Sequence, residues 1–143
     1  MRLGIAEILK KVNDAPASKR IEILQKYGHN NMALYTILKY TFDKRVVFLL
    51  PPGSPPYTEN PYVDQHSNLY NEVRRFYLFV EGPQTNLTPV KREMLFIKLL
   101  ENVDKEDAKI VIKMKDHQKP YPNITEKLIN QAFPGMLEQE IKF

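Results

Sequence analysis

Residues 104–137 read DKEDAKIVIKMKDHQKPYPNITEKLINQAFPGML, and this stretch decides the fold. Apolar residues recur at helical spacing on both sides of a basic segment that contains two prolines. Asp104 predicts a helix start, and Glu106 and Asp107 suit the positive end of that helix's dipole. The stretch therefore predicts two helices joined by a basic turn, the second ending at 133–135.

The second helix of this pair is expected to begin near Asn123. Asn123 with Glu126 three residues on resembles a capping box, with Asn in place of the usual Ser or Thr. Backbone amides at a helix start, with Lys113, Lys115 and Lys119 leading into it, favour phosphate oxygens through dipole, hydrogen bond and charge. Such contacts hold a protein on a nucleic-acid backbone without reading sequence. A plain solvated face is the alternative.

A second basic cluster comprises Lys39, Lys44 and Arg45, set against Asp43. These three cations are weaker candidates for nucleic-acid binding, and a solvated face again remains the alternative. Aromatic residues are interleaved with them, but the chain has no tryptophan and no alternating aromatic strand. A platform for stacking bases is therefore not expected.

Length and composition predict one domain over residues 1–143, large enough to bury an apolar core. The net charge of +4 and the isoelectric point near 9.2 permit an acidic partner without requiring one. The absence of cysteine excludes disulfides and thiolate metal sites and fits a reducing compartment. Since no run of 18 apolar residues occurs, we expect a cytoplasmic protein without a membrane partner.

Apolar spacing along the rest of the chain predicts an all-α bundle of six to seven helices. Ser18, Asn30 or Asn31, and Thr88-Pro89 are the expected helix starts. The helix after Asn31 is expected to continue through 46–50, although 45–50 also resembles a short buried strand. The residues expected to face the core are Ile5, Ile8, Leu9, Val12, Ile21, Leu24, Leu34, Ile37, Leu38, Leu69, Val73, Phe76, Tyr77, Val80, Val90, Met94, Ile97 and Leu100.

Residues 51–65 form a predicted proline-rich loop, and 134–143 a predicted C-terminal tail. The segment PPGSPPYTENP holds five of the eleven prolines, so it is not helix interior. We interpret the loop as a long surface connection, with a partner-binding proline segment as the alternative.

Catalytic equipment is nearly absent from the sequence. The histidines at 29, 66 and 117 have no partner at metal-ligand spacing, and the acids at 104, 106 and 107 suit a helix start better than a metal. Five glycines form no phosphate-binding loop and no dinucleotide fingerprint. We therefore expect no enzyme activity, no cofactor and no metal ligand.

Several segments, taken in order, resemble one known family. ILKKVNDAPASKRIEILQKYGHNN at 8–31 is a short helix, a small-residue turn and a lysine-rich helix, and LYTILKYTFDKRVVFLLPPG at 34–53 is a helix ending in prolines. Lys115-Asp116 and Asn130 followed by FPGML at 133–137 complete the series. The chain is thus similar to the N-terminal DNA-binding domain of ATP-dependent DNA ligases of the T-even bacteriophage type.

The resemblance implies a helical bundle that grips duplex DNA around a nick, with the turn before the last helix taking part. It implies phosphate contacts by Lys113, Lys115, Lys119, Asn123, Thr125 and Lys127. The ligase turn is shorter and contains a glycine. Asn123 is the residue of this chain that comes nearest to the position of that glycine in the sequence. Asn tolerates the left-handed backbone that such a glycine adopts.

Ligase activity itself is not expected. Residues 113–116 read Lys-Met-Lys-Asp and lack the glycine of the Lys-x-Asp-Gly motif that takes AMP in the family's nucleotidyltransferase domain. We expect no such domain in this protein. The hypothesis is a phage-encoded, non-catalytic accessory that binds duplex or nicked DNA without sequence preference, in the host cytoplasm. The alternative is a module that has lost DNA binding and engages a phage or host protein through its proline-rich loop.

Overall fold

The computed structural model describes residues 3–62, 65–82 and 86–138 and confirms the all-α prediction. Within these ranges the α-helices are α1 (Ile5–Asp14), α2 (Ala17–Gly28), α3 (Met32–Phe42), α4 (Asn68–Glu72), α5 (Pro89–Asn102), α6 (Lys105–Lys115) and α7 (Glu126–Ala132). Two 3-10 helices accompany them, η1 (Val73–Phe79) and η2 (Met136–Glu138). None of these helices is both long and apolar enough to cross a lipid bilayer.

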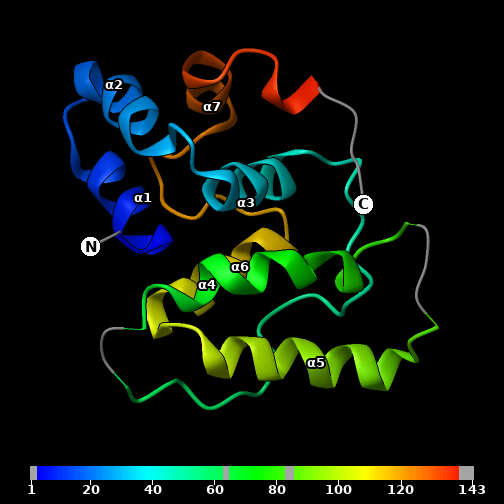
Figure 1. Cartoon of the computed structure of the whole chain (residues 1–143). Helices are drawn as coiled ribbons and strands as arrows, with labels where there is room; N and C mark the ends of the chain where they lie inside the picture. Colours follow the sequence, from blue (N-terminus) through cyan, green and yellow to red (C-terminus); the bar gives the residue numbers. More distant parts are fainter. Residues whose placement is uncertain (1–2, 63–64, 83–85, 139–143) are drawn as a thin grey trace.

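The helices α3 and α6 pack against each other in the middle of the molecule (Figure 1). Towards one end α1 packs on α2 and α2 packs on α7, while α5 covers the other end beside α6. Apolar faces of all these elements meet in one core, whose largest fully buried side chains are Phe76, Ile5, Ile8, Leu9, Leu24, Leu34, Ile37, Leu38, Leu69, Leu100, Met114 and Ile124. Burying each such side chain stabilises the fold by about 1.5–3 kcal/mol.

Three predicted helix starts are confirmed. The side chain of Asn31 accepts a hydrogen bond from the Leu34 amide at 3.0 Å, and Thr88 does the same for Lys91 at 3.2 Å. Asp104 accepts from the amide of Glu106 at 3.0 Å. Each cap satisfies an amide that has no partner within its helix.

Two predicted starts are wrong. Helix α2 begins at Ala17, directly after Pro16, so Ser18 lies inside the helix and does not cap it. Helix α7 is capped by Thr125, whose hydroxyl accepts from the Leu128 amide at 3.2 Å. Asn123 lies upstream in the turn because it bonds to another part of the chain, as described below.

The predicted continuation of the third helix through 46–50 is also wrong. Asp43 ends α3, and its carboxylate accepts the backbone amide of Arg45 at 3.0 Å, which turns the chain out of the helix. Residues beyond are extended, and Phe48 forms an isolated antiparallel bridge with Val80. The strand-like interpretation of 45–50 was therefore nearer to the structure.

The face that helix α5 turns to the core was predicted only in part. Leu100 is buried as predicted, and Phe96 is buried too, but Val90 and Met94 are 65% and 54% exposed. Arg92 is buried too, because its guanidinium donates to the carbonyl of Leu78 at 3.0 Å. The prediction from apolar periodicity assumed that only apolar residues face the core. Arg92 also faces it, because its guanidinium reaches a backbone carbonyl.

In η1 the inward positions follow the three-residue period of a 3-10 helix. Phe76 and Phe79 are buried, while Tyr77, which was predicted to face the core, is 47% exposed. In a 3-10 helix side chains three apart eclipse, so the prediction from 3.6-residue spacing fails at Tyr77, although Phe76 is buried as predicted.

The loop from residue 51 to 62 runs along α5 and α6 (Figure 1). The Gly53 amide donates to Asp116 Oδ2 at 3.1 Å, and the Thr58 amide donates to Glu101 Oε2 at 2.8 Å. Asn60 donates to the carbonyl of Asn102 at 3.1 Å. These bonds fix the described part of the loop to the bundle; residues 63–64 of the predicted loop and 139–143 of the predicted tail lie outside the described ranges.

Gly28 is the last residue of α2, and its lack of a side chain matters for packing. A Cβ at this position would lie 2.4 Å from Cζ of Phe133. We expect Gly28→Ala to lower the free energy of unfolding by about 1–3 kcal/mol, because the ring must shift. Urea unfolding measures this, with Ser18→Ala, at an exposed position of the same helix, as a control near wild type. A Gly28→Ala protein as stable as wild type would contradict this packing.

Helix α6 ends in a Schellman motif, with Gln118 N bonded to Lys113 O at 2.8 Å and His117 N to Met114 O at 3.1 Å. His117 occupies the position that glycine usually takes, with φ of 55°. Its ring nitrogens compensate: Nδ1 lies 2.9 Å from the Thr41 carbonyl oxygen and Nε2 lies 2.8 Å from that of Val46.

The His117 conformation gives a paired test. His117→Ala and His117→Gly both lose the two ring contacts, but only glycine is relaxed at a positive φ. We therefore expect both variants to be less stable than wild type, with the glycine variant the more stable of the two by about 1 kcal/mol in urea unfolding. Equal stabilities of the two variants would show that the backbone at 117 carries no strain.

Candidate nucleic-acid interface

The turn between α6 and α7 is attached to the end of α1. The Asn123 amide donates to Asn13 Oδ1 at 2.9 Å, and Asn123 Nδ2 donates to the Asn13 carbonyl at 2.9 Å. The Asn123 N–H is therefore already engaged and is not offered to a phosphate. Asn123 also does not adopt the left-handed backbone expected of a glycine substitute, since the described non-glycine residues with positive φ are Asn30 and His117.

Thr125 is also engaged within the protein. Its hydroxyl caps α7, and the helix it caps has only seven residues. The Asn123 amide and the Thr125 hydroxyl, two groups predicted to bind a phosphate at this helix start, thus already have hydrogen-bond partners within the protein. The lysines around the turn remain as the candidates for contact with an anion.

Those lysines differ in exposure. Lys119 is exposed, and its ammonium lies 3.4 Å from the Pro122 carbonyl oxygen. Lys113 is half-buried and donates to the Pro120 carbonyl at 3.2 Å, which braces the turn. Lys127 is exposed in the first turn of α7. The two prolines thus supply carbonyls that hold lysine ammonium groups along the turn.

Lys115 is a correction to the predicted interface. Its side chain is only 2% exposed, and the ammonium donates to the Pro51 carbonyl at 2.8 Å and to Asp116 Oδ1 at 2.6 Å. The same Asp116 carboxylate holds the Gly53 amide. Lys115 therefore points inward and attaches the proline-rich loop to α6, and it is left out of the proposed DNA contacts.

Lys39 is a second correction. Its side chain is 10% exposed, and its ammonium donates to the Met136 carbonyl at 2.9 Å and lies 3.3 Å from Asp43 Oδ2. Arg45 pairs with the same carboxylate at 2.7 Å and donates to the Leu137 carbonyl at 3.1 Å. Both predicted DNA contacts thus hold the segment after α7 against α3.

Asp43 is the centre of this arrangement, and its side chain is 4% exposed. Hydrogen bonds from the Arg45 side chain, helped by the Arg45 amide and Lys39, lower the pKa of Asp43 to about 2 despite its burial. The carboxylate therefore stays ionised near neutral pH. Lys44 is exposed and remains a candidate contact, and Arg45 is exposed but engaged as described.

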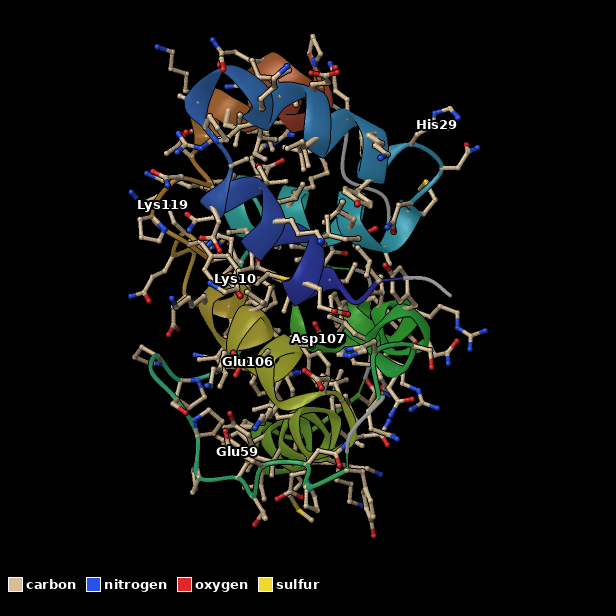
Figure 2. All side chains as sticks on the ribbon, turned by 90° about the vertical axis from the view of Figure 1, so that its left-hand side faces the viewer. Lys10, His29, Glu59, Glu106, Asp107 and Lys119 are labelled. Carbon is tan, nitrogen blue, oxygen red and sulfur yellow. The ribbon has the colours of Figure 1, made fainter. Side chains whose placement is uncertain are left out.

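Two lysines of α1 that were not predicted from the sequence come near the turn, because Asn13 of the same helix pairs with Asn123. Lys10 and Lys11 are exposed at the end of α1, just before Asn13. Figure 2 shows Lys10 and Lys119 on the same side of the molecule. Lys10 pairs with Asp14 at 3.1 Å, but both side chains are more than half exposed, so the pair is weak. We name Lys10, Lys11, Lys113 and Lys119 the cationic turn surface.

Sequence reasoning missed Lys10 and Lys11 because about 100 residues separate them from the turn. The Asn13–Asn123 pair, between residues 110 positions apart, holds the end of α1 beside the turn. The adjacent lysines on an amphipathic helix were the only hint of a binding surface in this segment. Such pairs usually form no more than the solvent-exposed face of a helix.

Fold and surface together define an all-helical domain with cationic side chains gathered around one interhelical turn. Residues 8–119 match the family of unknown function DUF6433, and the chain belongs to that family. No curated protein matches the chain, and no solved structure matches it.

Proposed function

We propose that this protein is a non-catalytic accessory that binds duplex or nicked DNA without sequence preference through the cationic turn surface, in replication, repair or recombination. The observation that carries the proposal is the Asn13–Asn123 pairing, which joins Lys10 and Lys11 to the turn that bears Lys113 and Lys119. Lysines from two distant segments then bind phosphates along one backbone. The resemblance to ligase DNA-binding domains supports the same function.

Binding of this kind depends steeply on salt. Each neutralised phosphate releases condensed counterions, so log K falls as log salt concentration rises, and each contact adds roughly 0.9 to the magnitude of this slope for duplex DNA. The four lysines of the cationic turn surface would contribute a slope of about 3–4. Lys127 and Lys44 would add to it if the DNA extends over α7 or past the end of α3.

The test is fluorescence anisotropy with intact, nicked and single-stranded DNA of equal length, from about 50 to about 200 mM salt. The double variant Lys11→Ala/Lys119→Ala is expected to lower the slope by about 2. The matched control is Lys91→Ala/Lys98→Ala, which removes the same charge from exposed positions of α5 at the opposite end of the molecule (Figure 1).

Two results would contradict the proposal. One is the absence of salt-dependent binding at the lowest salt, and the other is an equal loss of affinity in the two double variants, which would indicate only net charge. A preference for the nicked duplex would tie the protein to work at strand breaks, whereas equal affinity for intact duplex would leave a general duplex-binding accessory.

A second candidate function is binding of a phage or host protein beside the proline-rich loop. A groove of about 360 Å³ lies between the loop and α5, lined by residues 50–56 together with Glu93, Phe96, Ile97 and Lys115. A photo-cross-linking residue at Ser54, with Ser67 as the exposed control position, tests it. A discrete adduct from Ser54 alone, without DNA binding, would favour this function over the first.

A further inference from the structure

Asp107 is a buried carboxylate with one oxygen unsatisfied. From the sequence, Asp107 was expected to complement the helix dipole, but in the structure it is completely buried. Its Oδ1 accepts the backbone amide of Ala6 at 2.8 Å, whereas Oδ2 has no hydrogen-bond partner. Burial raises the pKa of Asp107 to about 6, against the opposing effects of the Ala6 amide and His66. A buried oxygen without a partner destabilises a fold, so it calls for a ligand.

Two further metal-ligating side chains lie at the same place. Candidate ligand atoms of His66, Asp104 and Asp107 all lie within 4.8 Å of one another. Asp104 Oδ2 accepts the Glu106 amide, while Asp104 Oδ1 lies 3.8 Å from His66 Nδ1. Each carboxylate therefore has one oxygen bonded to a backbone amide, which leaves Asp104 Oδ1 beside His66 and Asp107 Oδ2 unsatisfied.

The second nitrogen of His66 completes the pattern. His66 Nε2 lies 3.4 Å from Glu7 Oε1, and that same oxygen accepts the Gly4 amide at 3.0 Å. Histidines that bind metals commonly use their other ring nitrogen to contact a carboxylate, which fixes the tautomer and the ring orientation. Glu7 occupies this supporting position here.

We propose that His66 Nδ1, Asp104 Oδ1 and Asp107 Oδ2 bind a divalent zinc-like cation. Zn²⁺ takes three nitrogen or oxygen ligands of a protein plus water, at about 2.0–2.2 Å. Ligands of one tetrahedral ion then lie about 3.4 Å apart, so the cluster has to contract by roughly 1 Å. The imidazole favours Zn²⁺ over Mg²⁺ and Ca²⁺, which prefer oxygen ligands alone.

The cation would join three parts of the chain. His66 precedes α4, Asp104 and Asp107 belong to the start of α6, and the Ala6 amide bonded to Asp107 belongs to α1. Figure 2 shows Asp107 on α6 below α1. An ion held there binds the folded state and not the unfolded chain, so it raises the midpoint of thermal unfolding. This role is separate from the proposed DNA binding.

The experiment is isothermal titration calorimetry of the full-length, untagged chain with ZnCl₂, repeated with MgCl₂ and followed by thermal unfolding. One Zn²⁺ per chain and a raised midpoint are expected, without a matching response to Mg²⁺. Asp107→Asn, which keeps the size and the oxygen facing Ala6, is expected to weaken Zn²⁺ binding by about 100-fold or more. Glu7→Gln, which neutralises the carboxylate beside His66 but keeps an oxygen for the Gly4 amide, is expected to weaken it by about 10-fold.

Two controls separate this site from surface binding. His29→Ala removes an exposed histidine far from α6, and Glu106→Gln removes an exposed acid beside Asp107 (Figure 2). Both are expected to bind Zn²⁺ as wild type does. His66→Gln, at a partly exposed position, is expected to abolish the site even if Asp107→Asn fails to fold by circular dichroism. Absence of Zn²⁺ binding to wild type, or binding that survives in His66→Gln, would overturn the proposal.

Discussion

Asp43→Asn is expected to lower the free energy of unfolding at neutral pH by about 3 kcal/mol. The substitution keeps an oxygen that accepts the Arg45 amide, but it removes the negative charge facing Lys39 and Arg45. The Lys39 side chain, which is 10% exposed, then faces a neutral amide in place of the carboxylate. Breaking one side of a buried ion pair is costly because the remaining charge has lost its compensation.

The same carboxylate makes the wild type sensitive to acid. The pKa of Asp43 is about 2 in the folded protein and 3.8 in the unfolded reference, so its contribution is fully present above about pH 4. It is lost as the pH falls from about 4 to about 2, and it amounts to about 2 kcal/mol. The free energy of unfolding of Asp43→Asn should therefore lack this loss between about pH 4 and about pH 2.

Urea unfolding at pH 7 and along an acid series measures both effects. Asp14→Asn is the control, because Asp14 pairs with Lys10 in an exposed i, i+4 bridge and should remain close to wild type. If Asp43→Asn unfolded like Asp14→Asn at neutral pH, the buried pair would contribute nothing beyond a surface bridge. An unchanged acid limb in Asp43→Asn would likewise contradict the lowered pKa.

Lys115→Met is expected to lower the free energy of unfolding by about 3 kcal/mol while leaving DNA binding unchanged. Methionine fills a similar volume but cannot donate to the Pro51 carbonyl or pair with Asp116. Asp116 then keeps only part of its compensation, through the Gly53 amide. The expected structural result is release of the proline-rich loop from α6.

Hydrogen exchange at the Gly53 amide and urea unfolding measure the two consequences of Lys115→Met. Lys109→Met is the control on the same helix, since Lys109 forms an exposed bridge with Glu106. Anisotropy over the same salt series should give both variants the wild-type slope. A smaller salt dependence of DNA binding in Lys115→Met alone would indicate that Lys115 contacts DNA, and would contradict its structural role.

Local sequence patterns were sufficient to predict the all-helical fold and three of the five helix starts expected from the sequence. Asn31, Thr88 and Asp104 are capping residues whose partners lie two or three positions away, so local chemistry suffices to predict them. The apolar spacing of α1 was equally sufficient, because its inward residues all reach the core. These features depend on short-range geometry that any helix imposes.

Local spacing failed where a polar side chain found a distant partner. In α5, Arg92 takes a buried position because it reaches the Leu78 carbonyl. Asn123 does not cap α7 as predicted, because it pairs with Asn13. Such contacts depend on the arrangement of whole helices, and no periodicity in one segment encodes them.

Tertiary structure alone decided which charges face solvent. In the sequence, Lys39 and Lys115 cannot be told apart from Lys119. In the structure, however, the Lys39 ammonium donates to the Met136 carbonyl and the Lys115 ammonium to the Pro51 carbonyl, so both side chains lie inside. Asp107 reads like Glu106, yet helix packing buries it beside His66 and the Ala6 amide. The sequence sets the charge of each side chain, but the burial and partners that determine its role arise only when distant segments pack together.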